Sequence, residues 1–238
     1  MKIDIITLFP ELFSSFLDWS MIKKAREIGA LEVETHNLRN WGIDKRGTVD
    51  DRPYGGGPGM ILRIEPIYNA IQSLKPKTKN QKPKIILLSA KGKIFNQKVA
   101  RKLAKMEHLI LICGHYEGVD ERVRKYLIDE DISIGHYVLS GGEIPAMVVI
   151  DAVSRLLPGV LEKEGAAEIE SFSPGLREML NKQMAKGQMI NDQILIEFPQ
   201  YTRPPIFKGW KVPRILLSGH HQRITEWRAQ KIKVKRKT

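Results

Sequence analysis

The sequence predicts an α/β protein with a mostly parallel sheet, followed by a small basic domain. Short β-branched runs alternate with amphipathic helical stretches over about the first two-thirds of the chain, which is the pattern of strand–helix units with parallel strands. Several of the runs are apolar throughout, as expected of strands that helices cover on both faces. Near residue 161 the alternation stops, and further on positive charge accumulates.

The elements of the first part are expected in a strand–helix order. The strand candidates are Ile3–Leu8, Leu31–His36, Ile85–Leu88, Leu109–Cys113 and Ile132–Ile134. The helix candidates are Glu11–Ile28, Pro66–Leu74, Asn96–Lys105, Asp120–Leu127 and Glu143–Leu157. Asn96 and Asp120 are expected N-caps, because their short side chains accept hydrogen bonds from the first helical turn. The Pro158–Gly159 pair is expected to stop the last helix.

The change of composition after Leu161 predicts three regions. We expect an α/β domain over 1–160, an interdomain linker over 161–198, and a basic C-terminal domain over 199–238. The linker is acidic and rich in small residues at its start, with a short helix predicted over Leu176–Lys186 and irregular or extended chain over Asn191–Pro199. A helix is expected from about His221 to Lys231, so the last domain is predicted to be mainly helical.

The composition excludes several classes of protein. In 238 residues, 42% are hydrophobic and 28% are charged, which is ordinary globular usage and excludes a largely disordered or collagen-like chain. The longest apolar run, Ile144–Ile150, is far shorter than the roughly 20 residues of a membrane span. The acidic Asp4 interrupts the start where a secretory signal would be apolar. We therefore expect a cytoplasmic protein with no membrane partner. The single Cys113 excludes an internal disulfide and is expected to be a buried small residue.

Positive charge is concentrated at the end of the chain. The net charge is +12, and the residues from Pro199 onward hold eleven Lys or Arg side chains against one acid, Glu226, which is +10. Such a local field suits the phosphate backbone of a nucleic acid. Trp210 and Trp227 lie among these charges and support the same interpretation. The alternative for Lys231–Lys237 alone is a solvated tail.

Glycine-bearing loops punctuate the α/β part at residues 54–60, 89–92, 114–118 and 133–143. The last three each follow an expected strand, and ligands of open α/β sheets bind beyond the carboxyl ends of the strands. Glycine lets the backbone approach a ligand closely. None of the loops has the spacing of a dinucleotide or P-loop phosphate site. A flat, adenosine-like ligand held by main-chain groups fits these loops, and tight turns without a ligand are the alternative for any one of them.

Five segments in order carry a resemblance to a known family. They read PYGGGPGM, GHYEGVDER, SIGHYVLSGGEIPAMVVIDAVSRLLPGVL, YTRPP and VPRILLSGHH. At these separations the chain resembles the bacterial tRNA (guanine-N1)-methyltransferase family, which belongs to the SPOUT class, over nearly its whole length. The resemblance implies a homodimer whose α/β domain contains a deep trefoil knot.

The resemblance also implies a cofactor and the residues that hold it. The cofactor would be S-adenosyl-L-methionine, and the methyl group would go to N1 of the guanosine immediately 3′ of the anticodon in tRNA. Carried over by motif, the cofactor-binding residues are Leu88, Ser89, Gly114, Tyr116, Glu117, Ile134, Gly135, Tyr137, Leu139, Gly141, Gly142 and Pro145. The basic C-terminal domain would grip the anticodon branch. Mg²⁺ is implied by the resemblance alone, since the sequence shows no cluster of metal ligands.

The reaction requires a base, because guanine N1 carries a proton at neutral pH, and it requires positive charge near O6. The family motifs place the base at Glu170 and a supporting arginine at Arg155. Relatives usually carry aspartate where this chain has Glu170, so Asp192 in the same region stays open as the base. Solvated linker charge is the alternative for both acids, and an ordinary surface bridge to Asp151 is the alternative for Arg155.

Two other functions stay open on the sequence. One is a tRNA-binding protein of the same fold that has lost catalysis through the change at Glu170. The other is a SPOUT ribose 2′-O-methyltransferase, which the basic C-terminal domain and the YTRPP segment disfavour.

Overall fold

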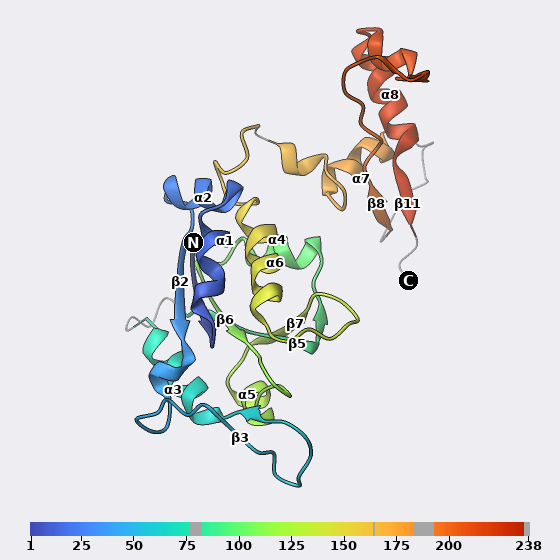
Figure 1. The fold of residues 1–238 in the computed structure, drawn as a ribbon. Coiled ribbons are helices and arrows are strands. Elements are labelled where there is room, and N and C mark those ends of the chain that lie inside the picture. Colours follow the sequence, from blue (N-terminus) through green and yellow to red (C-terminus); the bar gives the residue numbers. More distant parts are fainter. Residues whose placement is uncertain (77–81, 164, 183–192, 236–238) are drawn as a thin grey trace. The chain divides into compact units, whose positions relative to one another are not determined.

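The computed structural model (Figure 1) describes residues 1–76, 82–163, 165–182 and 193–235. Contacts between Cα atoms divide the chain into two compact units, Met1–Leu161 and Glu162–Thr238, called unit 1 and unit 2 below. Each unit has its own buried apolar residues. The division falls where the composition of the sequence changes.

Unit 1 is built on a five-stranded sheet with the order β2-β1-β6-β5-β7. Its strands are β1 (Lys2–Thr7), β2 (Glu32–Asn37), β5 (Lys84–Ile94), β6 (His108–Cys113) and β7 (Glu130–Ser133). Every neighbouring pair is parallel, which confirms the predicted α/β class and the five expected strands. The short strands β3 (Asp50–Asp51) and β4 (Ile61–Leu62) pair antiparallel and flank the first glycine loop. The knot stays an expectation from the resemblance.

Helices cover both faces of this sheet, which explains why Ile85–Leu88 of β5 and Leu109–Cys113 of β6 are continuous apolar runs. The helices α2 (Ser20–Glu27), α4 (Gln97–Leu103) and α6 (Glu143–Ser154) pack on one face, and α3 (Ile64–Leu74) and α5 (Glu121–Tyr126) pack on the other (Figure 1). Alternate residues of β1 divide between the two cores, since Ile3 and Ile5 belong to the first and Ile6 to the second.

The expected caps are present. Asn96 Oδ1 accepts a hydrogen bond from the Val99 amide at 3.1 Å, and Asp120 Oδ1 accepts one from the Arg122 amide at 2.8 Å. These bonds satisfy N–H groups that have no partner inside a helix. Helix α6 ends at Ser154, before the expected Leu157. Strand β5 continues to Ile94, beyond the expected Leu88, because it rejoins β7 after a short excursion.

The single helix expected over Glu11–Ile28 is wrong. The segment forms a 3₁₀ turn η1 (Pro10–Phe13), a one-turn helix α1 (Ser14–Leu17) and helix α2. Trp19 is extended and Ser20 has a φ of 48°, so the helical path is broken between α1 and α2. The Arg26 guanidinium of α2 donates to the Leu17 carbonyl at 2.9 Å, which satisfies one acceptor at the end of α1.

Unit 2 contains more structure than a linker and a helix. Its elements are η3 (Ala166–Glu168), α7 (Pro174–Asn181), β8 (Ile194–Ile196), β9 (Ile206–Phe207), β10 (Trp210–Lys211), η4 (Arg214–Leu217), α8 (His221–Lys231) and β11 (Lys233–Lys235). Strand β8 pairs antiparallel with β11. The core joins Leu176 and Leu195 to Ala229 and Ile232. The region 161–198, which we expected as a linker, therefore supplies α7 and β8 to unit 2, because its apolar residues pack against α8 and the chain that follows it.

Candidate active site

Three glycine-bearing segments of unit 1 meet in one cleft: residues 89–92 within β5 and the loops that follow β6 and β7. The cleft has a volume of about 180 Å³, and all twelve residues that the resemblance assigns to the cofactor line it. Leu88 and Ser89 come from the middle of β5, Gly114, Tyr116 and Glu117 follow β6, and the other seven lie between β7 and the first turn of α6. The structure thus brings together residues that lie up to 57 positions apart, Leu88 to Pro145.

Close backbone packing explains the glycines of this cleft. The Gly142 amide donates to the Gly114 carbonyl at 2.8 Å. A Cβ atom at Gly142 would lie 2.6 Å from the Cα atom of Cys113, and one at Gly114 would lie 3.3 Å from the Leu88 carbonyl oxygen. Any larger residue at position 142 would push the two loops apart. The main chain itself therefore forms the wall between the loops.

Partly exposed aromatic and acidic side chains form the rim. Tyr116, with a φ of 58°, and Tyr137 are both exposed. The Tyr137 hydroxyl donates to the Ile134 carbonyl at 3.2 Å, which fixes the ring over its own loop. The first glycine loop, residues 54–60, also reaches the rim, since the Glu117 amide donates to the Met60 carbonyl at 3.0 Å. A Cβ at Gly59 would lie 2.6 Å from Cγ of Glu117, so that glycine lets the loop close on Glu117.

A buried polar group that the sequence did not indicate lies beneath the cleft. Glu143, the first residue of α6, is buried, and its Oε1 accepts a hydrogen bond from the Thr7 hydroxyl at 2.8 Å. Cys113 is buried as expected. Burial raises the pKa of the Cys113 thiol well above its usual value, and the Glu143 charge raises it further. The thiol is therefore held protonated and is no nucleophile at neutral pH.

His115 contributes a polar atom without a partner. Its ring packs on Phe9 and Tyr116, with centroid separations of 5.1 Å and 4.8 Å. Nδ1 of His115 is buried and, within the described part of the chain, has no hydrogen-bond partner. A buried polar atom on the wall of a cleft marks a place where a ligand or water would be bound.

The two candidate catalytic residues belong to different units. Arg155 is half-buried at the C-cap of α6 in unit 1. Glu170 is half-buried in unit 2. The chain just after Glu170 is fixed to β8, because the Phe172 amide donates to the Leu195 carbonyl at 2.8 Å and Ser171 Oγ accepts from the Glu197 amide at 3.2 Å. Asp192, the alternative base, lies outside the described residues.

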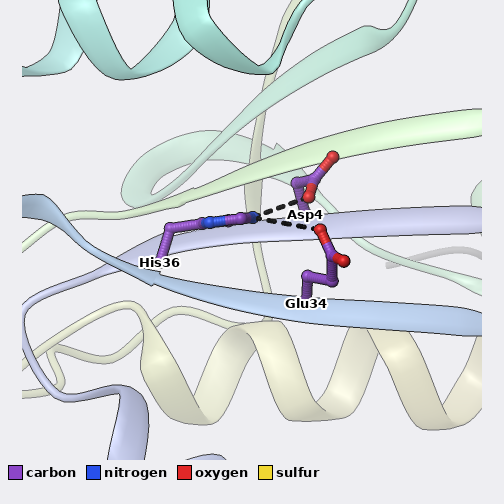
Figure 2. A group of neighbouring side chains, drawn as sticks. All are labelled: Asp4, Glu34 and His36. Atoms are coloured by element: carbon purple, nitrogen blue, oxygen red, sulfur yellow. Dashed lines mark hydrogen bonds and ion pairs between the residues drawn. The ribbon is translucent and has the colours of Figure 1, made fainter.

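A second cluster of titratable side chains lies on β1, β2 and β6, outside the lining of the cleft. The buried Asp4 of β1 accepts hydrogen bonds from His36 Nε2 and His108 Nε2, each at 2.6 Å. Asp4, Glu34 and His36 place their ligand atoms within 4.8 Å of one another (Figure 2). The Lys2 ammonium lies 3.0 Å from Glu34 and 3.6 Å from Asp4, so a side-chain cation already balances these acids.

The basic unit carries aromatic side chains on its surface. Tyr201 packs near Trp227 with ring centroids 6.4 Å apart, and the exposed Trp210 lies 6.0 Å from Phe207. The Arg228 guanidinium covers the Phe198 ring at 5.0 Å. Aromatic faces between cations are typical of surfaces that bind single-stranded nucleic acid.

Across the described residues, no helix is both long enough and apolar enough to cross a membrane.

Comparisons with known proteins identify the family of this chain. The family model described as tRNA (Guanine-1)-methyltransferase TrmD matches residues 1–238. The chain is 51% identical over 230 residues to a tRNA (guanine-N(1)-)-methyltransferase of Moorella thermoacetica, covering 97% of this chain and 84% of that protein. It is 48% identical to one from Halalkalibacterium halodurans, covering 97% and 85%. The crystal structure of tRNA (m1G37) methyltransferase from Aquifex aeolicus matches with a TM-score of 0.73 at 39% identity, covering 97% and 88%. The chain therefore belongs to the TrmD family of tRNA (guanine-1)-methyltransferases.

Proposed function

We propose that this protein transfers a methyl group from S-adenosylmethionine to N1 of the guanosine immediately 3′ of the anticodon in tRNA. Membership of the TrmD family indicates the class of reaction, and the names of the relatives indicate that the substrate is a guanine of tRNA. The observation that most directly supports the cofactor site is the convergence of all twelve candidate residues on one cleft.

The cleft fits this cofactor chemically. Its walls are main chain and small residues at Gly114, Gly141 and Gly142, which allow the close approach that a flat adenosine group needs. Among the described lining residues the cations are Lys91 and Arg124, and Arg124 is paired with Asp131. The site is therefore poor in charge for a nucleotide phosphate and suits a ligand without one. When bound, S-adenosylmethionine supplies an electrophilic methyl group.

The protein must remove the N1 proton of guanine as N1 becomes a nucleophile. We assign the role of proton acceptor to the carboxylate of Glu170, with Asp192 as the alternative. We assign to Arg155 the positive charge that supports the base and that stabilises the negative charge developing on the purine. In unit 2, the hydrogen bonds of Ser171 and Phe172 to β8 support the assignment to Glu170, because they fix the chain beside it.

The remaining assignments concern partners. The basic region 199–238 is proposed to hold the anticodon branch of tRNA, supported by its charge of +10 and by its surface aromatic residues. The active enzyme is proposed to be a cytoplasmic homodimer. Mg²⁺ is proposed as an additional requirement of the reaction.

Transfer of labelled methyl to a tRNA transcript tests the function. Label should appear on the wild-type transcript and disappear when the guanosine next to the anticodon is changed to adenosine. Nucleoside analysis of the product should give N1-methylguanosine. A 2′-O-methylated product would identify a ribose methyltransferase, and salt-sensitive tRNA binding without transfer would identify a non-catalytic binding protein.

A further inference from the structure

Strand β5 leaves the sheet for four residues beside the cleft. Leu87 pairs with Asp131 of β7 and Leu88 with Ile132, and then Lys93 pairs again with Ile132. The intervening residues 89–92 are an excursion from the ladder, which we call the β5 excursion. Gly92 holds its far end against β7, because a Cβ there would lie 2.5 Å from the Ile132 amide nitrogen. Its near end is Ser89, which lines the cleft.

One side chain ties this near end to two other parts of the site. Arg124 lies on α5, which follows the loop 114–118, and its guanidinium is mostly buried. Its Nη2 donates to Ser89 Oγ at 3.1 Å, and its Nη1 forms an ion pair with Asp131 of β7. The β5 excursion, β7 and α5 therefore share a single guanidinium. Glu121, also on α5, lies 3.7 Å from Nε of Arg124 at its exposed side.

These contacts determine how the Ser89 hydroxyl can act. A serine hydroxyl accepts through two lone pairs and donates one proton. Ser89 Oγ accepts from Arg124 Nη2 and from the Lys91 amide, each at 3.1 Å. Because both lone pairs are occupied, the proton is the group that is left to bond to a ligand.

We infer that Arg124 is a positioning residue that sets Ser89 as a hydrogen-bond donor to the bound cofactor. This inference rests on the proposed function, since it takes the cleft as the cofactor site. The planar guanidinium holds Nη2 on Ser89 Oγ and Nη1 beside the Asp131 carboxylate at the same time. A lysine ammonium is a compact charge on a flexible stem, so Arg124→Lys keeps a cation beside Asp131 without fixing Ser89. The role of Arg124 is thus in cofactor affinity rather than in the chemical step.

The test is a double-mutant cycle of Arg124→Met and Ser89→Ala in the full chain, with donor and tRNA varied separately. Each single variant should raise the KM for S-adenosylmethionine about tenfold, the loss expected of one hydrogen bond to the ligand. The KM for tRNA and kcat at saturating donor should change less than about twofold. The double variant should resemble the single variants, because both changes remove the same interaction.

The controls separate positioning from packing. Arg124→Lys should have a higher thermal stability than Arg124→Met, but its KM for S-adenosylmethionine should stay raised. Lys125→Met removes the neighbouring exposed charge of α5 and should leave both KM values unchanged. If the increases in the KM for S-adenosylmethionine multiplied in the double variant, Arg124 would act independently of Ser89. If Arg124→Lys fully restored this KM, the role of Arg124 would be its charge only. Either result overturns the inference and leaves the proposed function intact. Failure of the wild-type protein to bind the donor would instead overturn the proposed function and the inference with it.

Discussion

The hydroxyl of Thr7 donates a hydrogen bond to Oε1 of Glu143 at 2.8 Å, across 136 positions of sequence. The bond joins the last residue of β1 to the first residue of α6, directly after the glycine loop that lines the cleft. The same hydroxyl accepts from the Phe9 amide at 3.0 Å. Glu143 is buried, so its carboxylate depends on such donors to offset the loss of water.

Replacing Thr7 by valine should therefore destabilise unit 1. The variant keeps the shape of the side chain and removes one donor to a buried carboxylate, which costs about 1–3 kcal/mol. Urea unfolding followed by circular dichroism measures the change in unfolding free energy. Thr7→Ser keeps the hydroxyl and should recover most of the stability, whereas equal losses in the two variants would contradict a role for the hydrogen bond.

Replacing Gly142 by alanine should weaken cofactor binding. The added Cβ would lie 2.6 Å from the Cα of Cys113, so the loops must separate, and small displacements in a binding site cost about tenfold or more. Calorimetric titration with S-adenosylmethionine measures the affinity. Gly29→Ala is the control, because the space around Gly29 is open although its φ is 72°. Unchanged affinity in Gly142→Ala would exclude the close backbone packing as a determinant of binding.

The Asp4 cluster predicts acid sensitivity. Burial by itself would raise the pKa of Asp4, but the hydrogen bonds from His36 and His108 and the charge of Lys2 bring it below its ordinary 3.8. A carboxyl whose pKa is lower in the folded state stabilises the fold at pH values above 3.8, and that contribution is lost as the pH falls through the folded pKa. Glu34 and Lys2 face the same group.

Asp4→Asn should then lower the unfolding free energy at neutral pH by about 1–3 kcal/mol. The further decrease of this free energy below pH 3.8 should be less steep than in the wild-type protein. Unfolding curves from pH 2 to pH 7 measure both effects. Asp18→Asn removes an exposed carboxylate paired with Arg26 and should leave the acid limb unchanged. An acid limb of wild-type slope in Asp4→Asn would show that other groups set the acid sensitivity.

The two candidate bases are separated by amide substitution. Glu170→Gln removes the proton acceptor with little change in size, so turnover should fall about a hundredfold or more while cofactor affinity stays near the wild-type value. Asp192→Asn should change turnover little. Single-turnover methyl transfer at saturating cofactor measures both variants, and the reverse ranking would move the base to Asp192.

Local features of the fold were predictable, and long-range pairings were not. The apolar runs predicted all five sheet strands, and the Asn96 and Asp120 caps were visible because a cap and its helix are adjacent in sequence. The break at Ser20 was missed because its positive φ is not favoured by the residue type. The Thr7–Glu143 bond lies between residues far apart, so no local pattern could indicate it.

The candidate site follows the same division. Glycine loops after buried strands predicted where a ligand binds, and the resemblance supplied the cofactor and its twelve residues. Ser89 was expected through that resemblance, but Arg124 was not, because an arginine on an amphipathic helix has no local feature that indicates a partner 35 positions away. Irregular or extended chain was expected over Asn191–Pro199, but the pairing of β8 with β11 was missed for the same reason, since β11 follows helix α8.

The proposed function depends first on the claim that the β5 excursion and the loops after β6 and β7 hold S-adenosylmethionine. Isothermal titration of the purified wild-type protein with this cofactor tests it most directly. We expect saturable binding of S-adenosylmethionine, weakened in Gly142→Ala and unchanged in Gly29→Ala. Absence of binding heat at several temperatures, with the protein folded by circular dichroism, would contradict the claim.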